Sequence, residues 1–235
     1  MAELIAGLSS QRIAANYSRV REEVEQAAAA ATAKRAGRPT VEVLAAVKYV
    51  ADADLPLLHE AGIGLVGENR AQDLERKIAA HGELFEWDFI GQLQSRRVKL
   101  IVPHVRLIHS VASRSALAEL ARHAAAARTG LQILLQVNIA DEQGKAGIAA
   151  QEVGSYIADS PLPVAGLMTM PPLAAAPEEN RRWFAALREL ADAHGLRELS
   201  MGTTQDYLVA VQEGATIVRI GTRLYDQSPN RPRDP

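Results

Sequence analysis

Short apolar runs recur along the chain, and a segment with helical spacing follows most of them. This alternation constrains the fold more than any other feature, because strands that alternate with helices form parallel sheets. The eight runs that we predict to be strands are residues 41–50, 63–67, 87–90, 106–112, 131–138, 164–168, 199–201 and 216–220. They suit either a closed (β/α)8 barrel or an open doubly wound sheet. The number of strands favours the barrel, preceded by one long helix over residues 10–35.

The composition limits the class of protein. The 235 residues contain no linker-like stretch, so we expect a single domain over residues 1–227 and a disordered tail over residues 228–235. A formal net charge of −2 gives no reason to expect nucleic acid as a partner. Without cysteine, and with histidines that lack metal-ligand spacing, no metal site is predicted. With no apolar run of roughly 18 residues and no signal-peptide pattern, we expect a cytoplasmic monomer away from membranes.

Lys48 lies near the end of the first predicted strand, within the apolar run Val41–Val50. A strand of this composition is buried on both faces of a parallel sheet, where a lone ammonium is costly. Desolvation lowers the pKa of an amine and makes it a nucleophile toward aldehydes and ketones. The alternative is that Lys48 emerges at the end of the strand and pairs with a carboxylate such as Glu68. The other lysines lie among polar, helix-like neighbours or, for Lys145, in a Gly-rich loop.

Two segments rich in glycine and threonine follow the seventh and eighth predicted strands, Ser200–Thr204 and Gly221–Thr222. Small residues let backbone N–H groups approach an anion, and hydroxyl groups can donate hydrogen bonds to it. These are the two loops at which phosphate groups often bind in (β/α)8 barrels. The alternative is that Gly202 only allows a turn and that a threonine only caps the next helix.

Arg219 and Asn69 are two further candidates, each with a structural alternative. Arg219 interrupts the apolar run 216–220. It could form an ion pair with an inward carboxylate, or donate to the ring nitrogen or carboxylate of a ligand. Asn69 ends the second predicted strand and could face a ligand, but with Gln72 three residues later it also fits a helix capping box.

One small molecule matches these parts together. Pyridoxal 5′-phosphate (PLP) carries an aldehyde that can form a Schiff base with a lysine, a ring nitrogen and a phosphate. The sequence therefore predicts a PLP site in which Lys48 takes the aldehyde, Arg219 the ring nitrogen and the two loops the phosphate.

Several segments also resemble, in the same order, the YggS/PROSC family of pyridoxal-phosphate homeostasis proteins. The matching segments are Ala46-Val47-Lys48, Gly67-Glu68-Asn69, Phe89-Ile90-Gly91, Leu93-Gln94-Ser95, Gln136-Val137-Asn138, Lys145-Ala146-Gly147, Gly166-Leu167-Met168, Leu199-Ser200-Met201-Gly202 and Val218-Arg219-Ile220-Gly221-Thr222. The resemblance covers nearly the whole chain from Val41 to Tyr225 and implies a single barrel of the alanine-racemase type, a fold-type III PLP protein without the second, β domain. It also implies a set of cofactor-binding residues, namely Lys48, Asn69, Ser200, Met201, Gly202, Arg219, Gly221 and Thr222.

The resemblance implies a carrier of PLP rather than an enzyme with strong turnover. Apo forms of PLP-dependent enzymes are then the expected partners, and an arginine at the ring nitrogen weakens the cofactor as an electron sink. Two alternatives remain open. A small amino-acid racemase needs a second acid–base group, which Tyr49 or a partner chain would have to supply, and a Schiff-base aldolase would need no cofactor.

Overall fold

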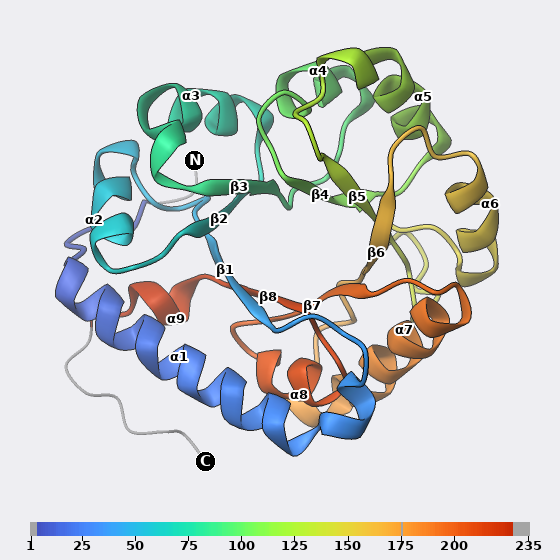
Figure 1. Cartoon of the computed structure of the whole chain (residues 1–235). Helices are drawn as coiled ribbons and strands as arrows, with labels where there is room; N and C mark the ends of the chain where they lie inside the picture. The colour runs from blue at the N-terminus through green and yellow to red at the C-terminus, as the bar shows by residue number, and fades with distance from the viewer. Residues whose placement is uncertain (1–3, 175, 228–235) are drawn as a thin grey trace.

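The computed structural model describes residues 4–174 and 176–227, and in it eight parallel strands close into a barrel. Each strand pairs with the next along the chain, and β8 closes the ring against β1 (Figure 1). The barrel is therefore confirmed and the open sheet is wrong. The strands are β1 (Glu42–Ala46), β2 (Leu65–Glu68), β3 (Glu86–Phe89), β4 (Leu107–Val111), β5 (Gln132–Gln136), β6 (Val164–Met168), β7 (Glu198–Thr203) and β8 (Ile217–Ile220).

Helices surround the barrel, and the predicted long leading helix is present (Figure 1). This helix, α1 (Ser10–Ala30), lies outside the ring and packs on three others, α2, α8 and α9. The remaining α-helices are α2 (Leu55–Glu60), α3 (Ala71–His81), α4 (Val98–Ile101), α5 (Arg114–His123), α6 (Val153–Ala158), α7 (Arg181–Ala193), α8 (Tyr207–Gln212) and α9 (Thr222–Tyr225). The last of these was not predicted.

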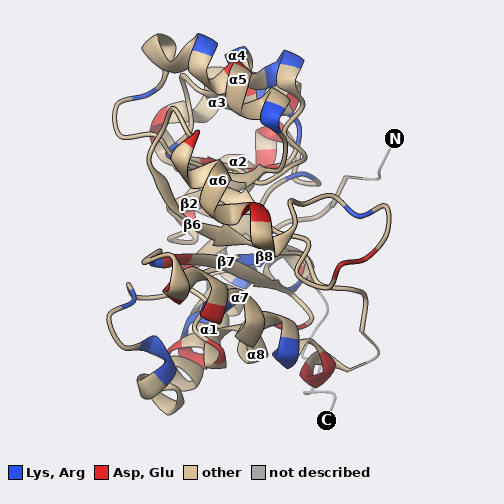
Figure 2. Cartoon of the chain, turned by 90° about the vertical axis from the view of Figure 1, so that its right-hand side faces the viewer, with Lys and Arg blue, Asp and Glu red and all other residues tan. Residues whose placement is uncertain are grey.

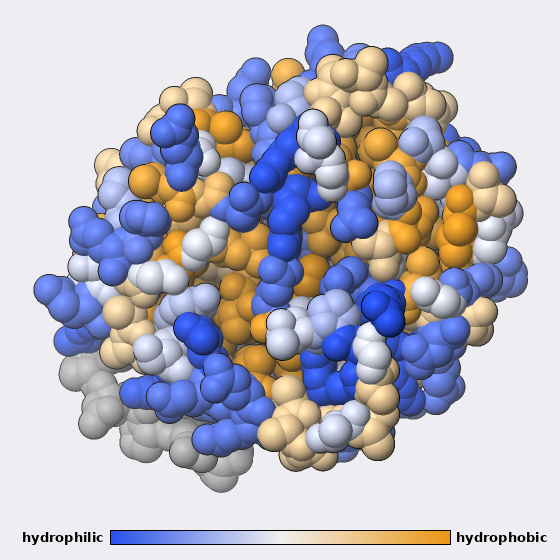
Figure 3. Space-filling view, viewed as in Figure 1, coloured by the Kyte–Doolittle hydropathy of each residue, from blue (hydrophilic) through white to orange (hydrophobic). Residues whose placement is uncertain are grey.

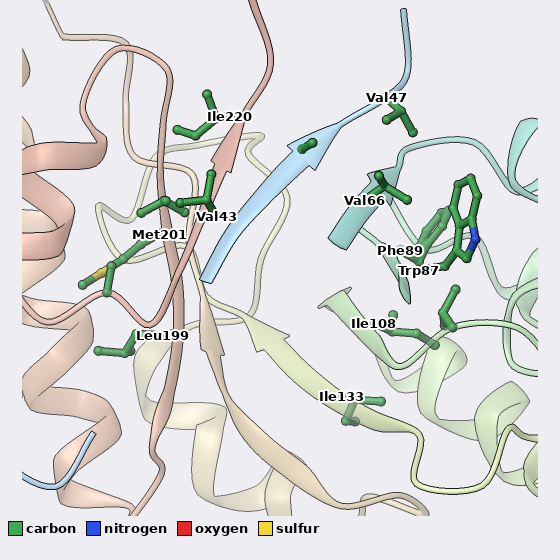
Figure 4. Close-up of a cluster of buried hydrophobic side chains, with 14 of the residues drawn as sticks. Val43, Val47, Val66, Trp87, Phe89, Ile108, Ile133, Leu199, Met201 and Ile220 are labelled. Atoms are coloured by element: carbon green, nitrogen blue, oxygen red, sulfur yellow. The ribbon is translucent and has the colours of Figure 1, made fainter. Parts of the chain in front are cut away.

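The hydrophobic residues form an outer and an inner core. The outer core lies between the strands and the helices, with Val66, Trp87 and Ile108 among its members (Figure 4). A small inner cluster fills the barrel itself and consists of Leu44, Leu107, Leu134, Met168 and Ile217. Burying one such side chain contributes about 1.5–3 kcal/mol to the stability of the fold. Both clusters therefore stabilise the barrel from which the strand ends project.

Several strand ends differ from the prediction, and two of these differences affect the candidate site. The first strand stops at Ala46 rather than reaching Val50, and Val47–Val50 is a turn closed by a hydrogen bond from Val50 N–H to Val47 O (3.0 Å). The seventh strand continues through Thr203 rather than ending at Met201, so Gly202 and Thr203 also lie within β7. The predicted tail over 228–235 lies outside the described residues.

Charged side chains are spread over the surface helices. Figure 2 shows basic and acidic residues side by side, with no continuous face of one sign in this view. Within residues 4–174 and 176–227, no helix is long and apolar enough to cross a membrane, and no group of three or more histidines and carboxylates is placed to hold a metal ion.

Candidate functional site

Lys48 projects from a turn at the carboxyl end of β1. Its side chain is half-buried rather than enclosed by a sheet, so the prediction of a lysine inside a buried strand is wrong. The Lys48 ammonium lies over the ring of Tyr49, 4.4 Å from its centroid, and forms no ion pair with any described residue. The amine is therefore held at the mouth of the barrel without a carboxylate, and the alternative pairing with Glu68 is also wrong.

Glu68 instead pairs with Lys77, which sequence reasoning treated as an ordinary helix lysine. The Lys77 Nζ lies 2.6 Å from Glu68 Oε2, and both side chains are almost fully buried. Lys77 lies on the buried face of α3 with Ala71 and Leu74. This spacing of three residues was the signal that could have identified Lys77 as buried.

Asn69 does not cap α3, so the capping-box alternative is wrong. The residue preceding the helix is Arg70, and no side chain caps it. The Glu68 carboxylate instead holds the two residues before α3, because its Oε1 accepts hydrogen bonds from the backbone N–H groups of Asn69 (2.6 Å) and Arg70 (3.1 Å). The Asn69 Oδ1 is buried and has no hydrogen-bond partner in the described structure, which is costly unless a ligand supplies a donor.

The ends of β7 and β8 lie side by side, as the phosphate-loop prediction requires. The Thr204 hydroxyl accepts a hydrogen bond from Gly221 N–H (3.2 Å), which joins the two segments. Gly202 adopts a φ of +90°, and a Cβ there would lie 2.6 Å from the Cβ of Ala210, so only glycine fits. Thr222 is exposed and begins α9. On the other side, Ala45 of β1 pairs with Ile220, so Lys48 and Gly221 follow neighbouring strands.

Two predicted cofactor residues, Ser200 and Met201, have fully buried side chains. The Met201 side chain belongs to the outer core beside Leu199 (Figure 4), so only its backbone could meet a ligand. The Ser200 side chain is fully buried inside the barrel, where its hydroxyl bonds to His109 and Arg219.

Arg219 lies inside the barrel on β8, with 6 % of its surface exposed. It forms no ion pair among the described residues, so the structural ion-pair alternative is not supported. Its guanidinium donates to Ser200 Oγ and to Thr169 O (3.1 Å), and the Met170 Sδ lies 2.9 Å away. Burial lowers the pKa of Arg219 to about 10, so the side chain is charged at neutral pH.

A chain of buried hydrogen bonds inside the barrel connects Arg219 to Asp88 through Ser200 and His109. Asp88 and His109, which sequence reasoning missed, lie 3.1 Å apart (Oδ2 to Nε2), and His109 Nδ1 lies 2.8 Å from Ser200 Oγ. Because a carboxylate only accepts, His109 Nε2–H donates to Asp88, and Nδ1 then accepts from the Ser200 hydroxyl. The single Ser200 proton is thus used within the barrel, and its oxygen is left to accept from Arg219. Leu107 points into the barrel. Because side chains alternate along a strand, His109, two residues later, points into the barrel as well, and this spacing could have identified it.

The buried His109 predicts a stability that depends on pH. Burial lowers the pKa of His109 despite the opposing effect of Asp88, below the ordinary value of about 6.5 that the unfolded chain has. The folded state therefore binds this proton less well, and its contribution to stability is complete above pH 6.5 and lost as the pH falls. We expect denaturant titrations to show that the free energy of unfolding falls as the pH drops below 6.5, by at most about 1.4 kcal/mol per pH unit from this one group.

His109→Gln is expected to remove this slope, whereas His123→Gln, which replaces a half-exposed histidine, should keep it. Equal slopes for wild type and His109→Gln between pH 6 and 5 would show that another group takes up the proton.

A cavity of about 840 Å³ lies at the opposite end of the barrel, between α1 and the beginnings of β1 to β3. Figure 3 shows hydrophilic side chains crossing the middle of one end of the barrel. Four arginines line the cavity, and each has a partner: Arg106 binds Glu42 and Asp88, Arg35 binds backbone carbonyls, Arg38 binds Asp192, and Arg21 lies 3.6 Å from Glu25. The candidate site is therefore the carboxyl end of the barrel rather than this cavity. That end holds the Lys48 amine, which has no ion pair among the described residues, and the joined segments of Thr204 and Gly221.

Comparison with known proteins identifies the family of the chain. The family described as "Alanine racemase, N-terminal domain" matches residues 8–229. A pyridoxal phosphate homeostasis protein of Aquifex aeolicus is 37% identical over 223 residues, which cover 89% of this chain and 96% of that protein. The chain belongs to the pyridoxal phosphate homeostasis protein family.

Two solved structures place this family member among its relatives. PipY of Synechococcus elongatus, solved with PLP bound, is 29% identical with a TM-score of 0.74, and the match covers 91% of this chain and all of that one. The alanine racemase of Corynebacterium glutamicum shares only the fold, at 18% identity and a TM-score of 0.66, and the match covers all of this chain but 66% of the racemase.

Proposed function

We propose that the chain binds PLP at the carboxyl end of the barrel through a Schiff base on Lys48, and that it serves in PLP homeostasis and delivery. The observation that carries this proposal is the Lys48 amine, which forms no ion pair with any described residue. It lies in the turn after β1, the strand next to β8, which leads to the joined segments of Thr204 and Gly221. The names of its relatives and the PLP-bound structure of PipY support the same ligand.

The residues at this end of the barrel suit the three polar parts of PLP. The Lys48 amine would take the aldehyde and Arg219 the ring nitrogen. Asn69 brings a buried acceptor that has no hydrogen-bond partner among the described residues. Backbone N–H groups near Gly202 and Gly221, with the exposed Thr222 hydroxyl, would hold the phosphate. Met201 can contribute its backbone only. Ser200 would bind the cofactor indirectly, by accepting a hydrogen bond from Arg219.

Arg219 decides which chemistry the bound cofactor could support. PLP supplies an electron sink for carbanions when its ring nitrogen is protonated. A guanidinium that is charged at neutral pH disfavours that proton and leaves less stabilisation of a carbanion. This favours a carrier over a racemase. Tyr49 keeps the racemase as the second candidate, because its ring lies directly beneath the Lys48 amine.

The test is to load the protein with PLP, reduce it with borohydride and map the modified peptide. We expect one reduced pyridoxyl group on Lys48, and transfer of unreduced PLP to an apo PLP-dependent enzyme. A label on Lys145, or on no lysine, would refute the proposed site. Accumulation of D-amino acid from L-alanine or L-serine would favour the racemase.

A further inference from the structure

We propose that the buried ion pair of Glu68 and Lys77 is a positioning device for the Lys48 turn and for Asn69. The inference rests on the proposed function, because it treats Lys48 as the residue that attaches PLP. Neither Glu68 nor Lys77 reaches the ligand itself in this proposal, so both would act through the backbone of their neighbours.

Lys77 anchors the turn that carries Lys48. Its Nζ donates to Val47 O at 2.6 Å, and the same carbonyl accepts from Val50 N–H to close the turn. Lys48 and Tyr49 are the two central residues of this turn. The Val47 N–H in turn donates to Gly67 O (3.0 Å), so the residue before Lys48 is held at both its polar backbone groups.

Glu68 joins this anchor to the second strand. Its Oε2 accepts from Lys77, while its Oε1 accepts from Asn69 N–H and Arg70 N–H. One carboxylate therefore connects the turn after β1, the end of β2 and the start of α3. Burial, and after it the charge of Glu68, raises the pKa of the Tyr225 phenol in α9.

Stability alone is a weak reason for such a pair. Removing two charges from water is costly, and replacing a buried ion pair by apolar side chains of similar size is often neutral or stabilising. The geometry points to a second role, because the pair fixes the backbone on both sides of the proposed ligand site. Small displacements of a reacting group are sufficient to slow a reaction about a hundredfold.

The test uses the double variant Glu68→Met/Lys77→Met, which replaces the pair by apolar side chains. We expect its melting temperature to equal or exceed that of wild type. The rate of PLP attachment to Lys48, followed by borohydride reduction and peptide mapping, is expected to fall about tenfold to a hundredfold. A second readout needs no PLP: reductive methylation by formaldehyde should label Lys48 in the variant at an altered rate relative to Lys145.

Two further variants complete the design. Glu68→Gln/Lys77→Met is also neutral but keeps a side-chain acceptor for Asn69 N–H, so it tests the anchor on Val47 alone and is expected to slow attachment as well. Lys34→Met is the matched control, because it removes an ammonium from another buried glutamate, Glu213, which keeps Arg181 and Arg188. It should attach PLP at the wild-type rate.

The inference would be overturned if both neutral double variants attached PLP to Lys48 and were methylated there at the wild-type rates. It would also be overturned if neither double variant folded, because the ion pair would then serve stability only. Failure of the proposed function looks different. In that case wild type itself carries no reducible label on Lys48, whereas the methylation rates still report whether the pair positions the amine.

Discussion

Lys48→Ala is expected to abolish the covalent attachment of PLP while leaving the fold intact. The side chain lies in a turn, and its ammonium makes a cation–π contact with the Tyr49 ring. Such a contact is worth about 0.5–1 kcal/mol at an exposed site. We therefore expect the free energy of unfolding to change by no more than about 1 kcal/mol. Peptide mapping after borohydride reduction, together with visible absorbance, measures the loss of attachment.

Lys145→Ala is the control for this variant. Lys145 is also a loop lysine, but its ammonium is paired with Glu142 at 3.0 Å. It should retain full labelling of Lys48. If Lys48→Ala still carried a reducible PLP group, the amine that forms the Schiff base would have to lie elsewhere.

Lys77→Met is expected to be the most destabilising of these substitutions. It leaves the Glu68 carboxylate buried with no counter-charge, and breaking a buried pair from one side costs about 3–5 kcal/mol. For a chain of this size, such a loss lowers the melting temperature by roughly 6–20 °C. Thermal and denaturant unfolding measure it directly.

The double variant Glu68→Met/Lys77→Met serves here as the internal control, because it removes both charges and should recover the lost stability. A single variant as stable as wild type would mean that Glu68 takes up a proton or finds water when Lys77 is gone. Lys34→Met should change stability less, because Glu213 retains two arginines.

The two lysines show where prediction from local composition fails. Lys48 lies in an apolar run and Lys77 among charged residues, so burial was assigned to the wrong one of them. The strand ends at Ala46 because its pairing with β8 stops one residue earlier, at Ala45, and the chain then turns. The helix buries Lys77 because it shares a face with Leu74. Local composition does not report either event.

Ser200 shows a similar limit at the candidate site. Its place in a Gly- and Thr-containing segment predicted a phosphate ligand, but in β7 its side chain is directed into the barrel and fully buried. The partner that uses its proton, His109, is 91 residues away in the chain. Only the closed barrel brings the two side chains together.

The order of eight strands, the leading helix and the segments of the candidate site could all be deduced from the sequence, because apolar periodicity and the placement of glycine are local properties. The tertiary structure decided which charges are buried and which hydroxyl protons are already used. Burial and hydrogen bonding depend on residues that are distant in the chain, and here the closure of β8 against β1 and the packing of α3 on the barrel determine them.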